Sequence, residues 1–304
     1  KDYYRSADIA FPSGLMDGEA LVSVKDGSVE LDIDGRIRGL SIEKDKLNVR
    51  LDALIKMRAS YGLKDKVTEY AGRLDVSRMD LDGIGTLGRL KNIKADIEFN
   101  DSRLWSENIL ADAYGVKWKA RINVINYAAP IFDIYADSEA RLSVIQKALK
   151  DEFNIKLPAE IAGKADIKLA IHMQPAQALK MDGYAAIDGA TISLGSGNFP
   201  IEGLTGEAQF DLNGIRWSGA KMKCGDSRYV SSGSLDDFAA PNINIEAVSQ
   251  DLAFKSALSV RGNTVRFSRL EGRYFGSAFS AAGDVNLGED GATHQILEDI
   301  GLMK

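Results

Sequence analysis

The chain has 304 residues, of which 45% are hydrophobic, 27% charged and 8% aromatic, a composition typical of a folded protein. Its 38 Lys and Arg are outnumbered by 44 Asp and Glu, for a net charge of −6, which disfavours binding to nucleic acid or to an anionic membrane surface. No apolar run is long enough to span a bilayer as a helix, and Cys224 is the one cysteine, so no internal disulfide can form. The chain opens at Lys1 without a Met, and we expect it to be a piece of a longer protein.

Alternation of apolar and polar residues with a period of two is the dominant pattern, and it predicts strands with one apolar face. Between residues 47 and 59 every odd position is apolar, and Leu54 alone breaks the alternation. The same pattern recurs at residues 29–33, 167–173, 208–212 and 243–247.

Turn dipeptides separate these runs, and Asp-Gly or Asn-Gly between alternating segments predicts β-hairpins. The expected turns are Lys25-Asp26-Gly27-Ser28, Asp34-Gly35, Asp182-Gly183, Asp188-Gly189, Asn213-Gly214 and Arg261-Gly262-Asn263. Successive hairpins form an antiparallel meander, whereas a parallel sheet needs helical crossovers that are nearly absent from this sequence.

Two short helices are expected. The first covers residues 138–153, with Asp137 or Ser138 as its N-cap and Pro158 beyond its end. Leu142, Ile145, Leu149 and Phe153 lie on one stripe of this helix. The second follows Thr293 and carries Ile296, Leu297 and Ile300.

An internal repeat begins near Ile93 and returns near Leu204, an offset of 204 − 93 = 111 in residue number. Aligned pairs include Phe99 with Phe210, Leu104 with Ile215, Trp118 with Tyr229, and the run 127–130 with 238–241. A third, shorter copy is expected from Leu258, with Val265, Phe267, Leu270, Phe279 and Gly283 in similar places. Ordinary similarity between β-meanders is the alternative explanation.

These residues resemble the AsmA-like family, which includes the TamB-type proteins of Gram-negative bacteria. The resemblance rests on Gly206-Glu207-Ala208-Gln209-Phe210-Asp211-Leu212, on the segment from Gly233-Ser234-Leu235-Asp236 to Pro241-Asn242-Ile243-Asn244-Ile245, and on Asp251-Leu252. It is clearest between residues 90 and 290.

The resemblance implies a mainly β fold, a long, twisted antiparallel β-sheet curled into an open groove. We therefore expect residues 1–89 to form an N-terminal meander of the groove and residues 90–304 to form repeated AsmA-like units, without a sharp boundary. It also implies a periplasmic location, an inner-membrane anchor in segments absent from this chain, and a role in lipid transport or outer-membrane biogenesis. The implied partners are a phospholipid or other lipid and an outer-membrane protein.

An apolar strand face lines such a groove or packs into an ordinary closed core, and the sequence leaves both readings open for each residue. The candidates for binding lipid chains are Leu47, Val49, Leu51, Ile55, Met57, Ile93, Ile97, Phe99, Ile167, Leu169, Ile171, Met173, Leu204, Phe210, Val265 and Phe267.

The sequence predicts no catalytic residue, metal site or cofactor. His172 and His294 are the only histidines and are far apart in sequence, which argues against a metal site or a His-based triad. Residues 83–88 fit the pattern G-x-G-x-x-G, but a strand-like segment follows where a dinucleotide site needs a helix.

We therefore expect a non-enzymatic protein that shields lipid acyl chains in an apolar groove. One alternative is a scaffold for the assembly of outer-membrane proteins. The other is a carbohydrate-active β-solenoid, although Trp105, Trp118 and Trp217 are not grouped with paired acids in the sequence.

Overall fold

The computed structural model describes residues 13–25, 27–44, 47–83, 89–153, 160–193, 200–238, 240–262 and 264–286. Within them, seventeen strands belong to one antiparallel sheet that is not closed, and strands consecutive in sequence are hydrogen-bonded neighbours. The predicted class, a mainly β chain with an open antiparallel sheet, is confirmed. The described part of the chain holds one helix, whereas the second expected helix lies outside the described residues.

The elements follow one another with short connections. The strands are β1 (Ser13–Lys25), β2 (Ser28–Lys44), β3 (Leu47–Gly62), β4 (Thr68–Asp82), β5 (Arg89–Asn100), β6 (Arg103–Ala113), β7 (Val116–Ile125), β8 (Ile131–Arg141), β9 (Glu160–Met173), β10 (Lys180–Ser193), β11 (Ile201–Asp211), β12 (Gly214–Cys224), β13 (Ser227–Asp236), β14 (Asn242–Val248), β15 (Leu252–Arg261), β16 (Thr264–Tyr274) and β17 (Ser277–Asn286). The helix is α1 (Leu142–Phe153).

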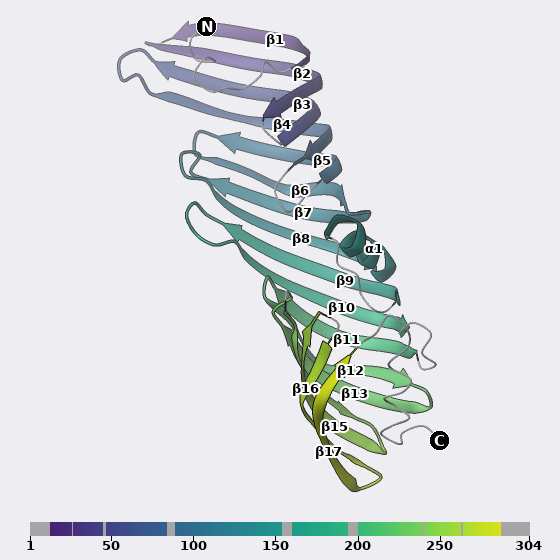
Figure 1. Cartoon of the computed structure of the whole chain (residues 1–304). Helices are drawn as coiled ribbons and strands as arrows, with labels where there is room; N and C mark the ends of the chain where they lie inside the picture. The colour runs from purple at the N-terminus through teal and green to yellow at the C-terminus, as the bar shows by residue number, and fades with distance from the viewer. Residues whose placement is uncertain are drawn as a thin grey trace. The chain divides into compact units, whose positions relative to one another are not determined.

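Figure 1 shows the strands, coloured by residue number from purple to yellow. The chain divides into two compact units. Unit 1 comprises Lys1–Ser138 and Leu169–Lys180, and unit 2 comprises Glu139–Lys168 and Met181–Lys304. The division into residues 1–89 and 90–304 stays a prediction.

In unit 1, the two faces of the sheet differ in chemistry. The odd-numbered face of β3 is mostly half-buried, and across β2–β5 the register places Ile37, Ala53, Val76 and Ala95 in one row. The even-numbered face carries exposed charges, such as Arg58, whose side chain lies 2.7 Å from that of Asp32. Leu54, the exception to the alternation, is exposed on this polar face. Exposed ion pairs add little stability, so burial on the apolar face is the main favourable term.

Several strands, among them β2, β4, β5, β6, β10, β11, β12 and β16, carry a β-bulge, an extra residue that bends the strand and shifts its alternation by one. On β12, Trp217 pairs with Gly233 and the next aligned pair is Ala220 with Ser231. Between these two pairs β12 therefore has one residue more than β13. The apolar face of β12 therefore runs through odd positions before the bulge and even positions after it. Equivalent shifts occur on β6 and β16.

Several bulges contain a residue with positive φ. The backbone N–H of this residue donates a hydrogen bond to a side chain of the neighbouring strand. The N–H of Gly39 (φ 59°) lies 2.7 Å from Asp52 Oδ1, and that of Gly219 (φ 65°) lies 2.9 Å from Ser232 Oγ. Asn92 (φ 52°) donates its N–H to Asp80 Oδ1 at 2.9 Å. A backbone donor that the bulge removes from the ladder is thus satisfied locally.

The 111-residue offset found in the sequence reappears in the strands. Adding 111 to the bounds of β6 and β7 gives those of β12 and β13, and the bulge of β6 at Ser106/Ile109 becomes the bulge of β12 at Trp217/Ala220. A further shift of 264 − 214 = 50 in residue number carries β12 and β13 onto β16 and β17, including the bulge at Phe267/Leu270.

The turns that flank these strands repeat as well. Asn126 and Asp237 both have positive φ, 61° and 63°. Their N–H groups bond to the carbonyls of Ser102 and Asn213 at 2.9 and 2.7 Å. Each then accepts a backbone N–H bond, from Ala129 and Ala240. Since all of these partners are related by the same offset, the repeat describes three-dimensional structure and not composition alone.

Three of the expected turns are wrong. Asp34-Gly35 lies inside β2, and Asp182-Gly183 and Asp188-Gly189 lie inside β10. Gly189 serves a bulge, and Gly183 leaves space for the ring of Phe210, its partner on β11. Glycine within a strand commonly has these roles, which the dipeptide rule does not separate from turns. Turns do follow β1, β11 and β15 as expected, although Asp26 and Asn263 lie outside the described residues.

The first helix begins later than expected. Residues 138–141 belong to β8, and α1 starts at Leu142. Ser138 is not a helix cap, because its hydroxyl donates to the Lys117 carbonyl on β7 at 2.7 Å.

The Asp80–Asn92 contact predicts a pH dependence of stability. The Asn92 N–H and then the Arg78 guanidinium lower the pKa of Asp80 in the folded chain. The unfolded chain therefore binds more protons as pH falls below about 4, and stability from this contact, full at neutral pH, is lost as pH falls through the folded pKa. Urea unfolding at pH 7 and pH 3 should show a smaller acid-induced loss for Asp80→Asn than for the unmodified chain. Equal losses in the two proteins would contradict this role of Asp80.

Candidate functional site

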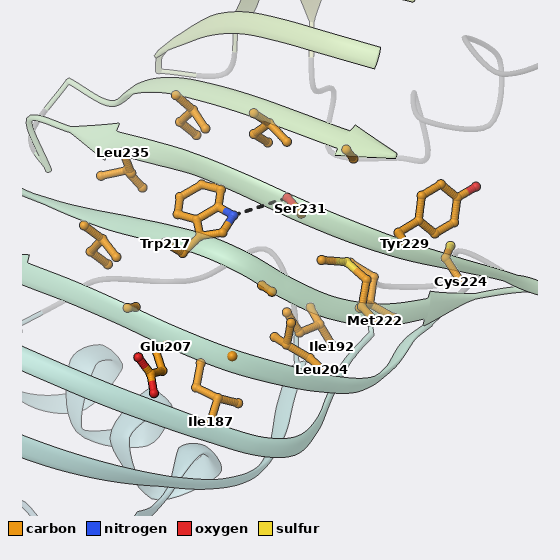
Figure 2. Close-up of a pocket in the computed structure, with 18 of the residues that line it drawn as sticks. Ile187, Ile192, Leu204, Glu207, Trp217, Met222, Cys224, Tyr229, Ser231 and Leu235 are labelled. Atoms are coloured by element: carbon orange, nitrogen blue, oxygen red, sulfur yellow. Dashed lines mark hydrogen bonds between the residues drawn. The ribbon is translucent and has the colours of Figure 1, made fainter. Parts of the chain in front are cut away.

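A pocket of about 690 Å³ lies on the apolar face of β10–β15 in unit 2, and Figure 2 shows its wall residues. We call it the trough. It is lined by Ile187, Ile192, Ile201, Leu204, Gly206, Glu207, Ala208, Ile215, Trp217, Ala220, Met222, Cys224, Tyr229, Ser231, Leu235, Ile243, Ile245, Ala247, Leu252 and Phe254. Its volume is typical of sites that take drug-sized ligands, roughly 300–1,000 Å³.

The floor of the trough is a row of small residues across four neighbouring strands. Ala220 pairs with Ser231, and Ser231 pairs with Ala247. Gly206 of β11 lies beside Ala220, so close that a methyl group on Gly206 would be 2.9 Å from the Ala220 Cα. Ala220, Ser231 and Ala247 are only 4–6% exposed. These small side chains, beside the bulge of β12, therefore leave the middle of the apolar face lower than its two sides.

Large side chains form two walls on either side of this floor. One wall holds Trp217 with the row Ile215, Leu235 and Ile243, which the register aligns across β12–β14. Met222 and its partner Tyr229 belong to the other wall (Figure 2). The resulting cross-section is low in the middle and high at the sides.

Trp217 is held in place by two contacts. Its indole packs over Gly233, where an added methyl group would come within 2.5 Å of the ring. Its Nε1–H donates to Ser231 Oγ at 3.2 Å (Figure 2). An aromatic side chain over a cross-strand glycine covers backbone that would otherwise meet water, and the hydrogen bond leaves the indole no free polar atom to present to a ligand.

Little charge enters the trough. Glu207 is the one charged residue of the lining; it is paired across β10 with Ala186, on the opposite face from the floor. The hydroxyl of Tyr184 donates to the Glu207 carboxylate, and this bond raises the pKa of the tyrosine. The carboxylate is therefore engaged by a residue outside the trough.

The described lining offers side chains for apolar contact and few for chemistry. Cys224 is a half-buried free cysteine, and no histidine joins it in the lining. Among the residues that the structure describes, no group of three or more His, Cys, Asp or Glu is placed to hold a metal ion. His172 contacts Asp133 in unit 1, with Nδ1 2.7 Å from Oδ1.

Of the residues expected to line a groove, the trough contains Leu204. Leu47 is 38% exposed and Ile93 is 4% exposed, while the others are half-buried. Phe210 packs over Gly183. These residues lie on the apolar faces of their strands, and whether they bind lipid stays a prediction.

Sequence reasoning missed the walls, above all Trp217 and Met222. The bulge at residues 218–219 shifts the alternation of β12, so no single period-two pattern links these two residues. A signal did exist in the 111-residue alignment, which pairs Leu104 with Ile215 and Trp118 with Tyr229 on the apolar face.

No protein-family model, curated protein or solved structure matches this chain. Separately, no helix in the described ranges has the length and apolar character needed to cross a bilayer.

The contact between Trp217 and Ser231 predicts a measurable coupling. Ser231→Ala removes the acceptor of the indole N–H, and Trp217→Phe removes the donor. A double-mutant cycle of unfolding free energies should give a coupling of about 0.5–1.5 kcal/mol, the net value of a typical protein hydrogen bond. Additive effects of the two substitutions would mean that the bond does not hold the wall.

Proposed function

We propose that this chain binds the hydrocarbon chains of a phospholipid or other lipid on its apolar sheet face and shields them from water. The observation that carries the proposal is the trough itself, a large concavity whose described lining is almost entirely apolar. On this proposal the protein is not an enzyme.

In the part of the chain that the structure describes, no second sheet lies over the apolar face, and this supports an open site. All seventeen described strands belong to the same sheet, so no other sheet of the described residues covers the trough. The buried apolar residues are mostly alanines, such as Ala190 and Ala247, while most larger side chains keep some exposure. A closed core would bury its large residues most completely.

The energy available from this surface is sufficient for lipid binding. At about 30 Å³ for a water-sized group, the 690 Å³ of the trough has room for roughly 20 methylene-sized groups. At about 0.8 kcal/mol per CH₂, complete burial of that many groups would contribute about 15 kcal/mol, and an open trough supplies the part of this that comes from the covered side of the hydrocarbon. An apolar lining would thus lower the free-energy cost of moving a hydrocarbon chain through water.

The head group would remain in solvent in this arrangement. The trough has no basic side chain in its described lining to hold a phosphate, and Trp217 and Ser231 satisfy each other. Binding would therefore depend on the hydrocarbon more than on the head group.

Repetition supports a role in transport. Because the strand units recur at a 111-residue offset, an apolar face can be lengthened by adding units. We propose that the chain is part of a periplasmic, inner-membrane-anchored protein that carries lipids between the inner and outer membranes of Gram-negative bacteria.

A scaffolding role is the second candidate, favoured by one edge of the sheet. Strand β1 pairs with β2, and no other partner is seen for it in the described ranges. Its side chains Leu15, Met16, Leu21, Val22 and Val24 are exposed large hydrophobics. Such an edge can accept a strand of another protein, for instance an outer-membrane protein during assembly.

Uptake of a fluorescent phospholipid by delipidated protein separates the two functions. We expect saturable uptake, and we expect bound lipid to protect Cys224, which lines the trough, from N-ethylmaleimide. Absence of saturable uptake would leave the scaffold as the better account, and uptake without protection would place the lipid elsewhere.

A matched pair of variants tests the location. Met222→Asp puts a charge in the wall, and burying an unpaired charge is costly, so affinity should fall at least tenfold, or about 1.4 kcal/mol. Lys221→Asp makes the same residue on the opposite face of β12 and should change affinity less than twofold. Circular dichroism should remain β-rich in both.

A further inference from the structure

The equivalent strands β6 and β12 distribute bulk in opposite ways. On the apolar face, β6 carries Ser106, Ile109 and Ala111, and the same positions of β12 carry Trp217, Ala220 and Met222. The pattern is small, large, small in the first repeat and large, small, large in the second. Because both strands have their bulge at the same place, the positions are equivalent in geometry as well as in sequence offset.

In unit 1 the large central residue fills the middle of the face. Ile109 packs against the buried cluster of Ala53, Val76 and Ala95, and it pairs directly with Ala95. Beside it, Ser106 is only 1% exposed. The protein's own side chain thus occupies the position at which unit 2 has its floor.

In unit 2 the corresponding position is Ala220, beside Gly206 in place of Ala95. The exchange of isoleucine for alanine removes three carbon atoms from the floor, and the exchanges to Trp217 and Met222 raise the walls. These four residues of the second repeat all line the trough: Gly206, Trp217, Ala220 and Met222.

We propose that Ala220 is the residue that determines hydrocarbon binding, and that the second repeat holds a discrete lipid-chain site which Ile109 closes in the first repeat. This inference rests on the proposed function. It adds where on the protein the hydrocarbon is bound and which residue sets the number of hydrocarbon chains that bind. The occupant is a flexible hydrocarbon chain, because Gly206, Ala220 and Ala247 are apolar, and Ser231 is engaged by the indole of Trp217.

The test transplants the first repeat's residue into the second. Ala220→Ile should weaken uptake of a fluorescent long-chain fatty acid at least tenfold and abolish protection of Cys224. Ala257→Ile makes the same change on the opposite face of β15, where Ala257 pairs with Asn244, and should alter affinity less than twofold. If Ala220→Ile loses the β-rich circular dichroism spectrum, Ala220→Val is judged by the same criterion.

The reciprocal variant tests capacity. The triple variant Ser106→Trp/Ile109→Ala/Ala111→Met copies both the floor and the walls of the second repeat, and it should raise the saturating stoichiometry by one fatty acid per chain. Two results would overturn the inference while leaving the proposed function standing: saturable uptake by the unmodified chain that Ala220→Ile leaves within twofold, or an unchanged stoichiometry in the folded triple variant. If the unmodified chain takes up no probe, the proposed function fails first.

Discussion

Continuity of one apolar face across bulged strands is the constraint on which this structure depends. A strand that gains one residue must move its apolar side chains from odd to even positions, or its oily face would turn to the other side of the sheet. Strand β12 does this between Trp217 and Ala220, and β6 and β16 do it at the same place. The bulge therefore bends the strand without breaking the face. Small residues at the bend and large ones beside it turn the face from a flat surface into a trough.

Satisfying the backbone at each bulge is the second requirement. The positive-φ residues Gly39, Asn92 and Gly219 each donate their N–H to a side chain of an adjacent strand. The two repeats meet the requirement differently at one equivalent position, where Asn92 stands in the first and Gly203 in the second. Glycine adopts this conformation at no steric cost, whereas Asn92 is accompanied by the charged acceptor Asp80. The same geometry is thus compatible with different sequences, which explains how the repeat persists with little identity.

The sequence predicts the strands of this fold well because period-two alternation is a local property. The run from Leu47 to Ala59 shows it most clearly, and the one exception, Leu54, is exposed on the polar face. Bulges are harder to predict from sequence, because Asp188-Gly189 at a bulge and Asn213-Gly214 at a turn are similar dipeptides. Their cross-strand partners, which the sequence does not show, distinguish the two. The trough was missed for that reason: Trp217 and Met222 belong to one face only after the shift of alternation between them. The start of α1 was misplaced because Ser138, a good helix cap in isolation, bonds to a neighbouring strand instead.

If a hydrocarbon chain lies in the trough against Trp217, bromine atoms on that hydrocarbon must quench the indole fluorescence. This can be measured with a phospholipid brominated on its acyl chains, in a Trp105→Phe/Trp118→Phe background where Trp217 is the one remaining tryptophan. We expect saturable quenching by the brominated lipid and none by its unbrominated counterpart. Saturable binding of the brominated lipid without quenching of Trp217 would contradict this expectation.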